Sequence, residues 1–267
     1  MTAALVIARG GSKRLPRKNV RPFCGIPLVA WSVIQAKCSK FIDEVYVSTD
    51  DEEIAEISAS YGAEIIIRPD WPDADQASGG RPTGHGLRTI QGMRPGFDLA
   101  VSMLPTAPCR YPDELDRMIT LFNELGGGDI SVGQTCPRRQ IVLGERIANG
   151  YVKTAIFDKH YRFCALAGGT GVASPAKMLA GFDPEGQDHD AELDARSESH
   201  VFDWPDSSAC PAIEVQMWQT IVDTDTIEEF ELGEVMMDHY ITGGRGASVY
   251  YEYAGDYRHL AGNGRQL

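Results

Sequence analysis

The chain has 267 residues, of which 43% are hydrophobic and 24% are charged, so it can bury one sizeable core and is not expected to be disordered. Its formal net charge of −13 excludes an ordinary nucleic-acid or membrane-surface binder, and any polyphosphate ligand would need a local basic cluster. Its apolar runs are too short to cross a membrane, and its six cysteines lack CxxC spacing, which is typical of reduced thiols in a cytoplasmic protein.

The first half of the chain alternates predicted strands with predicted helices. Strands are expected at residues 3–8, 43–48, 65–67 and 99–103, and helices at 28–37, 51–61 and 111–125. Asp50 is expected to cap the second helix and Gly62 to end it. This alternation predicts an α/β fold, a doubly wound and mostly parallel sheet of the Rossmann-like kind. Ligands of such sheets bind at the carboxyl ends of the strands.

The second half of the chain is less regular. A strand is expected at 130–134, a hairpin around Asn149-Gly150, another strand at 213–222 and a helix at 226–240. Between them lie a glycine-rich piece, 167–171, and an acidic piece, 183–198. We expect one domain over 1–243, with an inserted lobe within about 137–200, and a poorly packed tail over 244–267.

The turn after the first strand concentrates positive charge. Residues 1–42 contain no Asp or Glu, whereas residues 9–21 hold six cations, namely Arg9, Lys13, Arg14, Arg17, Lys18 and Arg21. Gly10 and Gly11 allow a tight turn that directs backbone N–H groups near Ser12 toward an anion. Arg9 and Lys18 are candidates to stabilise the charge of a leaving pyrophosphate. A merely solvated basic loop is the alternative, and the convergence of glycines, a serine and cations at a strand end disfavours it.

Two common nucleotide motifs are missing from this turn. It has no GKS or GKT, as a Walker A loop requires, and Gly10-Gly11 is followed by Ser-Lys rather than by the GxGxxG pattern. Kinases, ATPases and dinucleotide-dependent enzymes therefore lose their usual support.

Several segments carry a resemblance to a known family. They are ARGGSKRLPRKN at 8–19 with VRPFCGIPLVAWSVIQA after it, VYVSTDDEEIAEISASYGAEIIIRP at 45–69, MLPTAPCRYPDELD at 103–116, and IVDTDTIEEFELGE at 221–234. Together they resemble the acylneuraminate cytidylyltransferase family, whose members make CMP-sialic acids and related CMP-nonulosonic acids. The run KRLPRKNVRPFCG is most similar to the CMP-pseudaminic acid branch.

The resemblance implies a nucleotide-diphospho-sugar transferase type of fold whose inserted lobe serves dimerisation, and hence a homodimer. It implies CTP and a sugar acid as substrates and Mg²⁺ as cofactor. The matching nucleotide-binding residues are Ala8, Arg9, Gly10, Gly11, Ser12, Lys13, Lys18, Asn19, Arg68 and Ser78. Of these, Arg68 is implied on the cytosine side, and Ser78 lies where the family often has Ser or Thr.

Two carboxylates near the C-terminal end are candidate metal ligands. Asp223 and Asp225 alternate along the end of a predicted strand, so both face the same way, and paired carboxylates suit Mg²⁺. In the resembling family the matching pair holds the metal that bridges the triphosphate, which polarises the α-phosphorus. The alternative is that Asp225 or Thr224 only caps the helix that follows.

The sugar half of the site departs from the family. Leu104 stands where many sialic acid enzymes have Gln, and residues 167–175, AGGTGVASP, lack the family's aromatic residue. Arg138, Arg139 and Arg162 are basic candidates to reach a sugar carboxylate across a dimer interface. The sequence therefore leaves the sugar acid open.

Three other interpretations remain. In the first, the chain is a related nucleotidyltransferase, either of Kdo type or for another NTP or sugar. In the second, it is a non-catalytic nucleotide-binding homologue. In the third, it is a bifunctional chain. The Asp223 and Asp225 pair argues against the second, and the few residues after 243 argue against the third.

Overall fold

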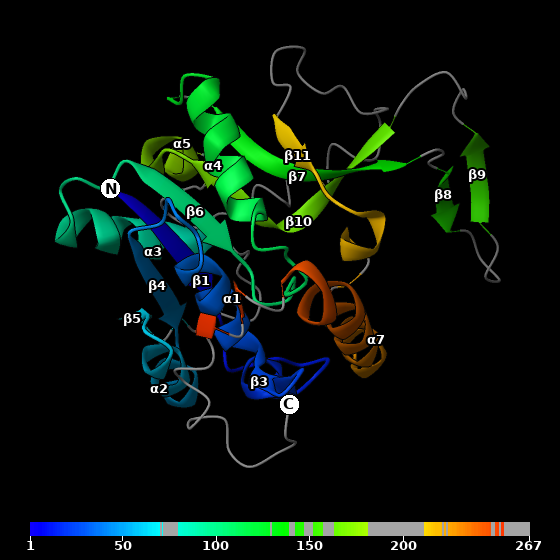
Figure 1. Cartoon of the computed structure of the whole chain (residues 1–267), viewed down its shortest axis with the longest axis horizontal. Coiled ribbons are helices and arrows are strands. Elements are labelled where there is room, and N and C mark those ends of the chain that lie inside the picture. Colours follow the sequence, from blue (N-terminus) through cyan, green and yellow to red (C-terminus); the bar gives the residue numbers. More distant parts are fainter. Residues whose placement is uncertain are drawn as a thin grey trace.

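The computed structural model describes residues 1–69, 71, 80–128, 130–138, 142–146, 152–156, 163–180, 211–220, 222, 224–246, 249–250 and 252–253. A seven-stranded sheet in the order β11-β7-β10-β6-β1-β4-β5 forms its centre (Figure 1). The strands are β1 (Thr2–Ile7), β4 (Glu44–Thr49), β5 (Glu64–Ile67), β6 (Leu99–Met103), β7 (Ser131–Arg138), β10 (Phe163–Ala173) and β11 (Ala212–Glu214).

The sheet is mostly parallel, as expected. β1 pairs in parallel with both β4 and β6, and β4 with β5, so that β1 is flanked by parallel neighbours. β11 pairs in parallel with β7, and only β10 runs antiparallel to both of its neighbours, β6 and β7. The carboxyl ends of β1, β4 and β6 therefore meet at one edge, which is where ligands of such sheets bind.

Helices cover both faces of this sheet (Figure 1). On one face α1 (Leu28–Lys37), α4 (Glu114–Glu124) and α7 (Ile227–Met237) share a core with Ala4 and Val6 of β1. On the other, α3 (Gly80–Met93) and α5 (Pro175–Ala180) pack near Ala3 and Leu5. The alternating directions of the β1 side chains thus feed two cores, as a doubly wound sheet requires.

The helices before the site follow from local sequence. α1 is apolar nearly all round and accordingly buried, and Trp31 Nε1 donates to Phe23 O at 2.6 Å. α2 (Glu52–Ser60) is amphipathic and ends at Gly62, whose φ is +91°. The expected cap at Asp50 is wrong, because Asp51 accepts the hydrogen bond from Ile54 N at 3.0 Å. Asp50 faces the basic turn instead.

Two parts of the second half differ from expectation. The strand expected over 213–222 stops at Glu214, and a 3-10 turn, η3 (Met217–Thr220), follows, with Gln219 accepting from Gln216 N at 2.8 Å. The sequence did not predict helix α3, because its glycines weaken the helical pattern. Gly86 is one of them, and a Cβ there would lie 2.8 Å from Leu5 Cδ2, so the glycine permits close helix–sheet packing.

Beyond β7 lies a separate hairpin, as predicted. Its strands are β8 (Val142–Arg146) and β9 (Val152–Ile156), and they stand apart from the central sheet in Figure 1. The turn at Asn149-Gly150 and the acidic piece 183–198 lie outside the described residues. Within the expected lobe, 137–200, the described residues form this hairpin, the central-sheet strand β10 and helix α5, and the lobe itself stays a prediction.

The expected poor packing of the tail is wrong for its described part. Helix α7 continues as a π-helix over Asp238–Arg245, and Tyr250 beyond it is only 1% exposed. Its hydroxyl donates to Arg110 O at 2.8 Å, and its ring meets Trp31 edge-on with centroids 6.1 Å apart. Aromatic side chains tie this segment to α1, which composition alone did not reveal.

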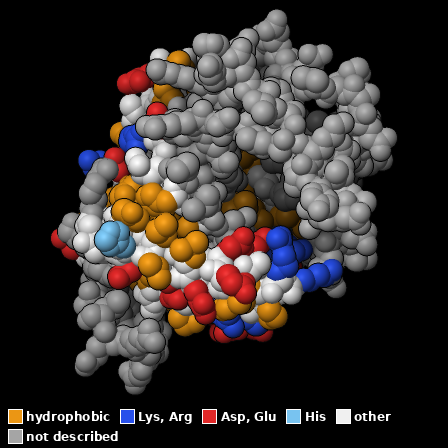
Figure 2. Space-filling model, turned by 90° about the vertical axis from the view of Figure 1, so that its right-hand side faces the viewer, with side chains coloured by type: hydrophobic (Ala, Val, Ile, Leu, Met, Phe, Trp, Pro, Cys, Tyr) orange, Lys and Arg blue, Asp and Glu red, His pale blue; other side chains and the backbone are white. Residues whose placement is uncertain are grey.

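The α7 side of the molecule is partly apolar. Figure 2 shows hydrophobic side chains gathered beside acidic and basic ones on this face. Val235, Leu232 and Tyr240 are exposed here, and the Tyr240 ring stacks on Trp218 with centroids 4.8 Å apart. Among the described residues, no helix is both long and apolar enough to cross a bilayer.

Candidate functional site

The basic turn starts at the carboxyl end of β1, in the middle of the sheet. Ala8 is buried, and its N–H donates to Ser48 O of β4 at 3.0 Å. Leu15 is also buried and anchors the turn in the core, and the short helix η1 (Lys18–Val20) closes it. The turn is therefore fixed at both ends and in its middle, while its cations lie outside the core.

Lys18 and Arg14 form ion pairs with Asp225, which comes from the other end of the chain. Lys18 Nζ donates to Asp225 Oδ1, and the Arg14 guanidinium pairs with Oδ2. The Lys18 and Asp225 side chains are 12% and 19% exposed, so the pair is largely shielded from water. Burial acts to raise the pKa of Asp225, but the bonds and charges of Lys18 and Arg14 hold that pKa below its usual value. The structure thus joins two residues that the sequence assigned to the triphosphate and to the metal.

Asp225 is not the cap of the following helix. The cap is Thr226, whose hydroxyl accepts from Glu229 N at 3.2 Å, while Glu229 Oε2 accepts from Thr226 N at 2.9 Å. Glu229 Oε2 also accepts from the Asp225 backbone N–H at 3.1 Å. This capping box leaves the Asp225 carboxylate to the loop cations. The capping alternative for Asp225 and Thr224 is therefore wrong, and Asp223 lies outside the described residues.

Two buried oxygens of the loop lack partners. Asn19 Nδ2 donates to Arg9 O at 2.9 Å, but Asn19 Oδ1 and the Ser12 hydroxyl are buried without a hydrogen-bond partner in the described part of the chain. A buried polar atom left unpaired costs about 1–3 kcal/mol. Both atoms belong to the basic turn: the Ser12 hydroxyl can donate to a phosphate oxygen, and Asn19 Oδ1 can accept from a hydroxyl or amino group of a ligand. Arg9 and Lys13 are exposed on the same turn.

Arg68 is buried beside the start of the loop. Its Nη2 donates to Ala8 O at 2.9 Å and to Asp50 Oδ1 at 3.1 Å, and its Nε is buried without a partner among the described residues. Burial lowers the pKa of this guanidinium. The structure therefore places Arg68 beside the start of the basic turn, and its implied contact with the cytosine stays a prediction, whereas Ser78 lies outside the described residues.

The backbone of the turn differs from the expected anion cradle. Gly10 N donates to Asp50 Oδ1 and Ser12 N to Gly10 O, both at 3.0 Å. Two of the N–H groups that the sequence assigned to phosphates thus have partners within the chain. Sequence reasoning gave Asp50 only a capping role and gave Asp51 none. Their position at the end of the strand next to β1 was the signal that could have placed them here.

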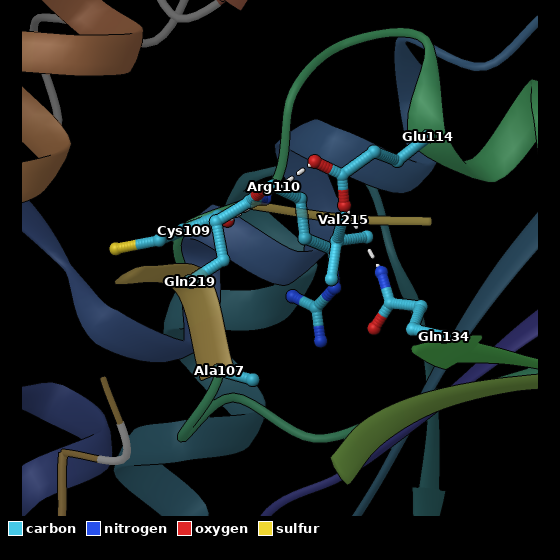
Figure 3. A pocket seen from close by; sticks show the side chains of 7 residues that line it. All are labelled: Ala107, Cys109, Arg110, Glu114, Gln134, Val215 and Gln219. Carbon is cyan, nitrogen blue, oxygen red and sulfur yellow. Dashed lines mark hydrogen bonds between the residues drawn. The ribbon is translucent and has the colours of Figure 1, made fainter. Parts of the chain in front are cut away.

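A second polar cluster lines a small cavity under the segment after β6 (Figure 3). The cavity measures about 20 Å³, room for a single water and too little for a sugar or nucleotide. Arg110 is 2% exposed, and Glu114 beside it accepts from Tyr111 N at 2.8 Å and from Gln134 Nε2 at 3.0 Å. Burial raises the pKa of Glu114. Sequence reasoning singled out neither residue.

Arg110 hydrogen-bonds to two segments, around Leu104 and Gly169, whose sequences differ from those of the resembling family. Its Nη2 donates to Leu104 O and to Gly169 O, both at 3.0 Å, and Gly169 O also accepts from Leu104 N at 2.8 Å. Thr224 N in turn donates to Thr106 O at 3.1 Å. The segment after β6 is therefore bonded to β10 on one side and to the residue next to Asp225 on the other. Leu104 itself is 41% exposed at the carboxyl end of β6.

The other basic candidates are not placed. Arg138 is the last residue of β7, and the direction of its side chain lies beyond what is described, while Arg139 and Arg162 are outside the described residues. Among the residues that the structure describes, no group of three or more His, Cys, Asp or Glu side chains is arranged to hold a metal.

Sequence comparison links the chain to sugar-acid cytidylyltransferases. Residues 3–78 match the family model for cytidylyltransferases. N-acylneuraminate cytidylyltransferase A of Danio rerio is 31% identical in an alignment of 174 residues that covers 55% of this chain and 40% of that protein. Pseudaminic acid cytidylyltransferase of Campylobacter jejuni is 36% identical over 119 residues, 44% of this chain and 51% of that protein. CMP-N,N'-diacetyllegionaminic acid synthase of Legionella pneumophila is 34% identical over 133 residues, 48% and 56% of the two chains.

The chain thus spans about half, or less, of the curated relatives it matches. Solved structures agree over a longer stretch. A CMP:2-keto-3-deoxy-manno-octonic acid synthetase complexed with CTP superimposes with a TM-score of 0.61 at 14% identity, covering 89% of this chain and 98% of the other. A cytidylyltransferase from Leptospira borgpetersenii gives 0.56 at 18% identity, covering 100% and 98%. The resemblance seen in the sequence is confirmed, and the fold is that of the cytidylyltransferases.

Proposed function

We propose that this chain is a cytidylyltransferase that activates a nonulosonic, sialic acid-like sugar acid with CTP, giving the CMP-sugar and pyrophosphate. The observation that carries the proposal is the joint placement of Lys18, Arg14 and Asp225 at the carboxyl end of β1. On the same turn, the unpartnered Ser12 hydroxyl fits a phosphate oxygen, and the unpartnered Asn19 Oδ1 fits a hydroxyl or amino group of a nucleotide. The relatives named for N-acylneuraminate, pseudaminic acid and diacetyllegionaminic acid support the choice of sugar acid.

Loop cations account for the nucleotide half of the reaction. Lys18 and Arg14 exchange the Asp225 carboxylate for phosphate oxygens when the triphosphate enters, and Arg9 and Lys18 face the pyrophosphate as it leaves. Asn19 and Arg68 hold the nucleoside end, with Ser12 and Lys13 on the phosphates. Most of the rate then comes from positioning and fixed charge, as the sugar acid's anomeric hydroxyl attacks the α-phosphorus in line.

Asp225, together with Asp223, is proposed to hold Mg²⁺. The donor set fits the ion, because a carboxylate whose pKa is held low is ionised at neutral pH and offers the oxygen ligands that Mg²⁺ prefers. When bound, the metal draws charge from the α-phosphate and neutralises the departing pyrophosphate. Release of Asp225 by Lys18 and Arg14 is what makes its oxygens available for that role.

We also propose a cytoplasmic homodimer. Members of the resembling family are often dimers, the cysteines are typical of a reducing compartment, and gathered apolar side chains such as those on α7 are typical of surfaces that bind another protein. Sedimentation of the full chain tests the oligomer, with a monomer at tens of micromolar as the contradicting result.

A pyrophosphate-release assay tests the function. CTP, ATP, GTP and UTP are each offered with Mg²⁺ and with sialic, pseudaminic, legionaminic and Kdo-type acids. The expected result is pyrophosphate with CTP and at least one nonulosonic acid. Turnover with the Kdo-type acid alone favours the Kdo-type alternative. CTP binding without turnover on any sugar acid favours a non-catalytic nucleotide-binding homologue.

A further inference from the structure

The junction between β4 and α2 touches the beginning of the nucleotide loop. Asp50 Oδ1 accepts the hydrogen bond of Gly10 N at 3.0 Å. Asp51 packs directly on the same residue, since a Cβ at Gly10 would lie 2.9 Å from Asp51 Cβ and closer still to its Oδ2. Only glycine allows this approach, so the start of the loop packs against the carboxylates of Asp50 and Asp51.

The same junction holds the other end of the loop. Arg17 Nη1 donates to Asp51 Oδ2 and its Nη2 to Asp51 Oδ1 at 3.2 Å, while Glu53 also pairs with Nη2. Such a fork between guanidinium and carboxylate fixes direction as well as distance. Arg17 adopts left-handed backbone angles, with φ +59° and ψ +24°, which a non-glycine residue rarely holds without support. The residue that follows it is Lys18.

Asp51 is itself held in place by helix α2. Its Oδ1 caps α2 by accepting from Ile54 N at 3.0 Å, and the hydrogen bonds of Arg17 and the helix N–H keep its pKa below the usual value despite partial burial. One side chain therefore joins three parts: the helix, the first glycine of the loop and the arginine that ends it. Between those two ends lie Ser12 and Arg14.

We propose that Asp51 is a positioning residue for the nucleotide. It fixes the separation of Gly10 and Arg17, so that the Ser12 hydroxyl, Lys18 Nζ and Asn19 Oδ1 converge on one ligand. Asp51 acts through the loop and does not itself contact the ligand. This inference rests on the proposed function, because it presumes that the loop binds a nucleoside triphosphate.

The competing view is a helix cap that also makes a surface ion pair. That view confines the effect of Asp51 to the stability of α2, because exposed ion pairs contribute little and nothing in it reaches the ligand. The positioning role instead predicts a loss of nucleotide affinity in a protein that stays folded. Two measurements on the same variants therefore separate the two views: CTP affinity and thermal unfolding.

The principal variants are Asp51→Asn and Arg17→Ala in the full chain. Asn keeps the shape and the capping ability of Asp but breaks the charged fork, and Arg17→Ala breaks it from the other side without touching the cap. Calorimetric titration with CTP and Mg²⁺ is expected to show a dissociation constant raised about tenfold in each. In the double variant the loss is no larger than in either single one, because both remove the same interaction. The matched control is Glu56→Gln, an exposed carboxylate on the same helix, which leaves the affinity unchanged.

Steady-state kinetics add a second readout. The KM for CTP is expected to rise in step with the dissociation constant. The KM for the sugar acid is expected to stay within about twofold of the wild-type value, because Asp51 positions only the loop that binds the nucleotide. If Asp51→Asn melts early, Arg17→Ala decides the matter, since its helix cap is intact. Unchanged CTP affinity in both variants, with a wild type that binds CTP, overturns the positioning role and leaves the proposed function standing. A wild type that binds no CTP contradicts the proposed function itself.

Discussion

Lys18 and Asp225 lie 207 positions apart in the sequence, yet the Lys18 ammonium donates to the Asp225 carboxylate at the carboxyl end of β1. Arg14 takes the second oxygen of the same carboxylate. The cation proposed for the phosphates and the carboxylate proposed for the metal thus neutralise one another in the ligand-free chain. Each must change partner when the nucleotide and its metal bind, and several predictions depend on that exchange.

Asp225→Asn tests the carboxylate. The amide keeps the size of the side chain but binds Mg²⁺ poorly and holds Lys18 and Arg14 without charge, so pyrophosphate release is expected to fall at least about a thousandfold. Because the Lys18 and Asp225 side chains are only 12% and 19% exposed, loss of the ion pair is expected to remove about 1–3 kcal/mol from the free energy of unfolding and to lower the thermal midpoint by several degrees, with the chain still folded. A wild-type rate in this variant contradicts the metal assignment.

Metal and nucleotide are expected to bind cooperatively. With Lys18 and Arg14 on Asp225, Mn²⁺ alone meets a neutralised carboxylate and binds weakly, whereas CTP draws both cations away. Titration of free Mn²⁺ by its paramagnetic signal is expected to show an affinity at least about tenfold higher with CTP present. In Lys18→Met, Mn²⁺ alone binds more tightly while CTP binds more weakly. Equal Mn²⁺ affinity with and without CTP contradicts the exchange.

The ion pair of Asp51 and Arg17 makes the stability of the chain pH-dependent. The pKa of Asp51 is lower in the folded chain than the usual 3.8, because the Arg17 hydrogen bond favours the ionised form. Its contribution is therefore fully present above the unfolded-state pKa and disappears as pH falls through the lower folded-state pKa. The unfolding free energies of the wild type and Asp51→Asn, measured with urea, are expected to differ at pH 7 and to approach one another only as the pH falls below 3.8 and through the lower folded-state pKa. A constant difference across that range contradicts this origin.

Arg110 is expected to be the costliest of these residues to remove. Arg110→Met deletes four hydrogen bonds, to Thr170, Gln35, Leu104 and Gly169, and removes the positive charge that acts to lower the pKa of Glu114. The free energy of unfolding is expected to drop by about 3–5 kcal/mol. Adding Glu114→Gln removes the uncompensated charge and restores part of the loss. Denaturant unfolding of the single and double variants checks both expectations.

Leu104→Gln probes the sugar half. Leu104 is exposed at the carboxyl end of β6 and its backbone is fixed by Gly169 and Arg110, so a polar side chain enters without disturbing the segment. The KM for the best sugar acid is expected to change about five- to tenfold, because one hydrogen bond to a substrate contributes about that much. CTP affinity stays the same. A change in CTP affinity instead would place Leu104 on the nucleotide side.

The sequence alone determined the class of the fold and the position of the basic turn that we propose binds the nucleotide. Both rest on local signals, namely the alternation of apolar strands with helices and six cations within residues 9–21 of an acidic chain. The helix predicted at 28–37 and the strand predicted at 99–103 have the same bounds in the structure, because their apolar runs are bracketed by clear breaks. Helix α3 escaped notice because its glycines suit close packing on Leu5, a tertiary requirement that weakens the local helical signal.

Only the tertiary structure decided which charges face one another. Whether Asp225 caps a helix or joins the loop depends on Thr226 and Glu229 forming their own capping box and on the turn that holds Lys18 lying beside the start of α7. Likewise Asp51 contacts both Gly10 and Arg17 because β1 and β4 are neighbours in the sheet. Electrostatic pairing falls steeply with separation in space and is independent of separation along the chain, so these partners are fixed only once the strands have been placed side by side.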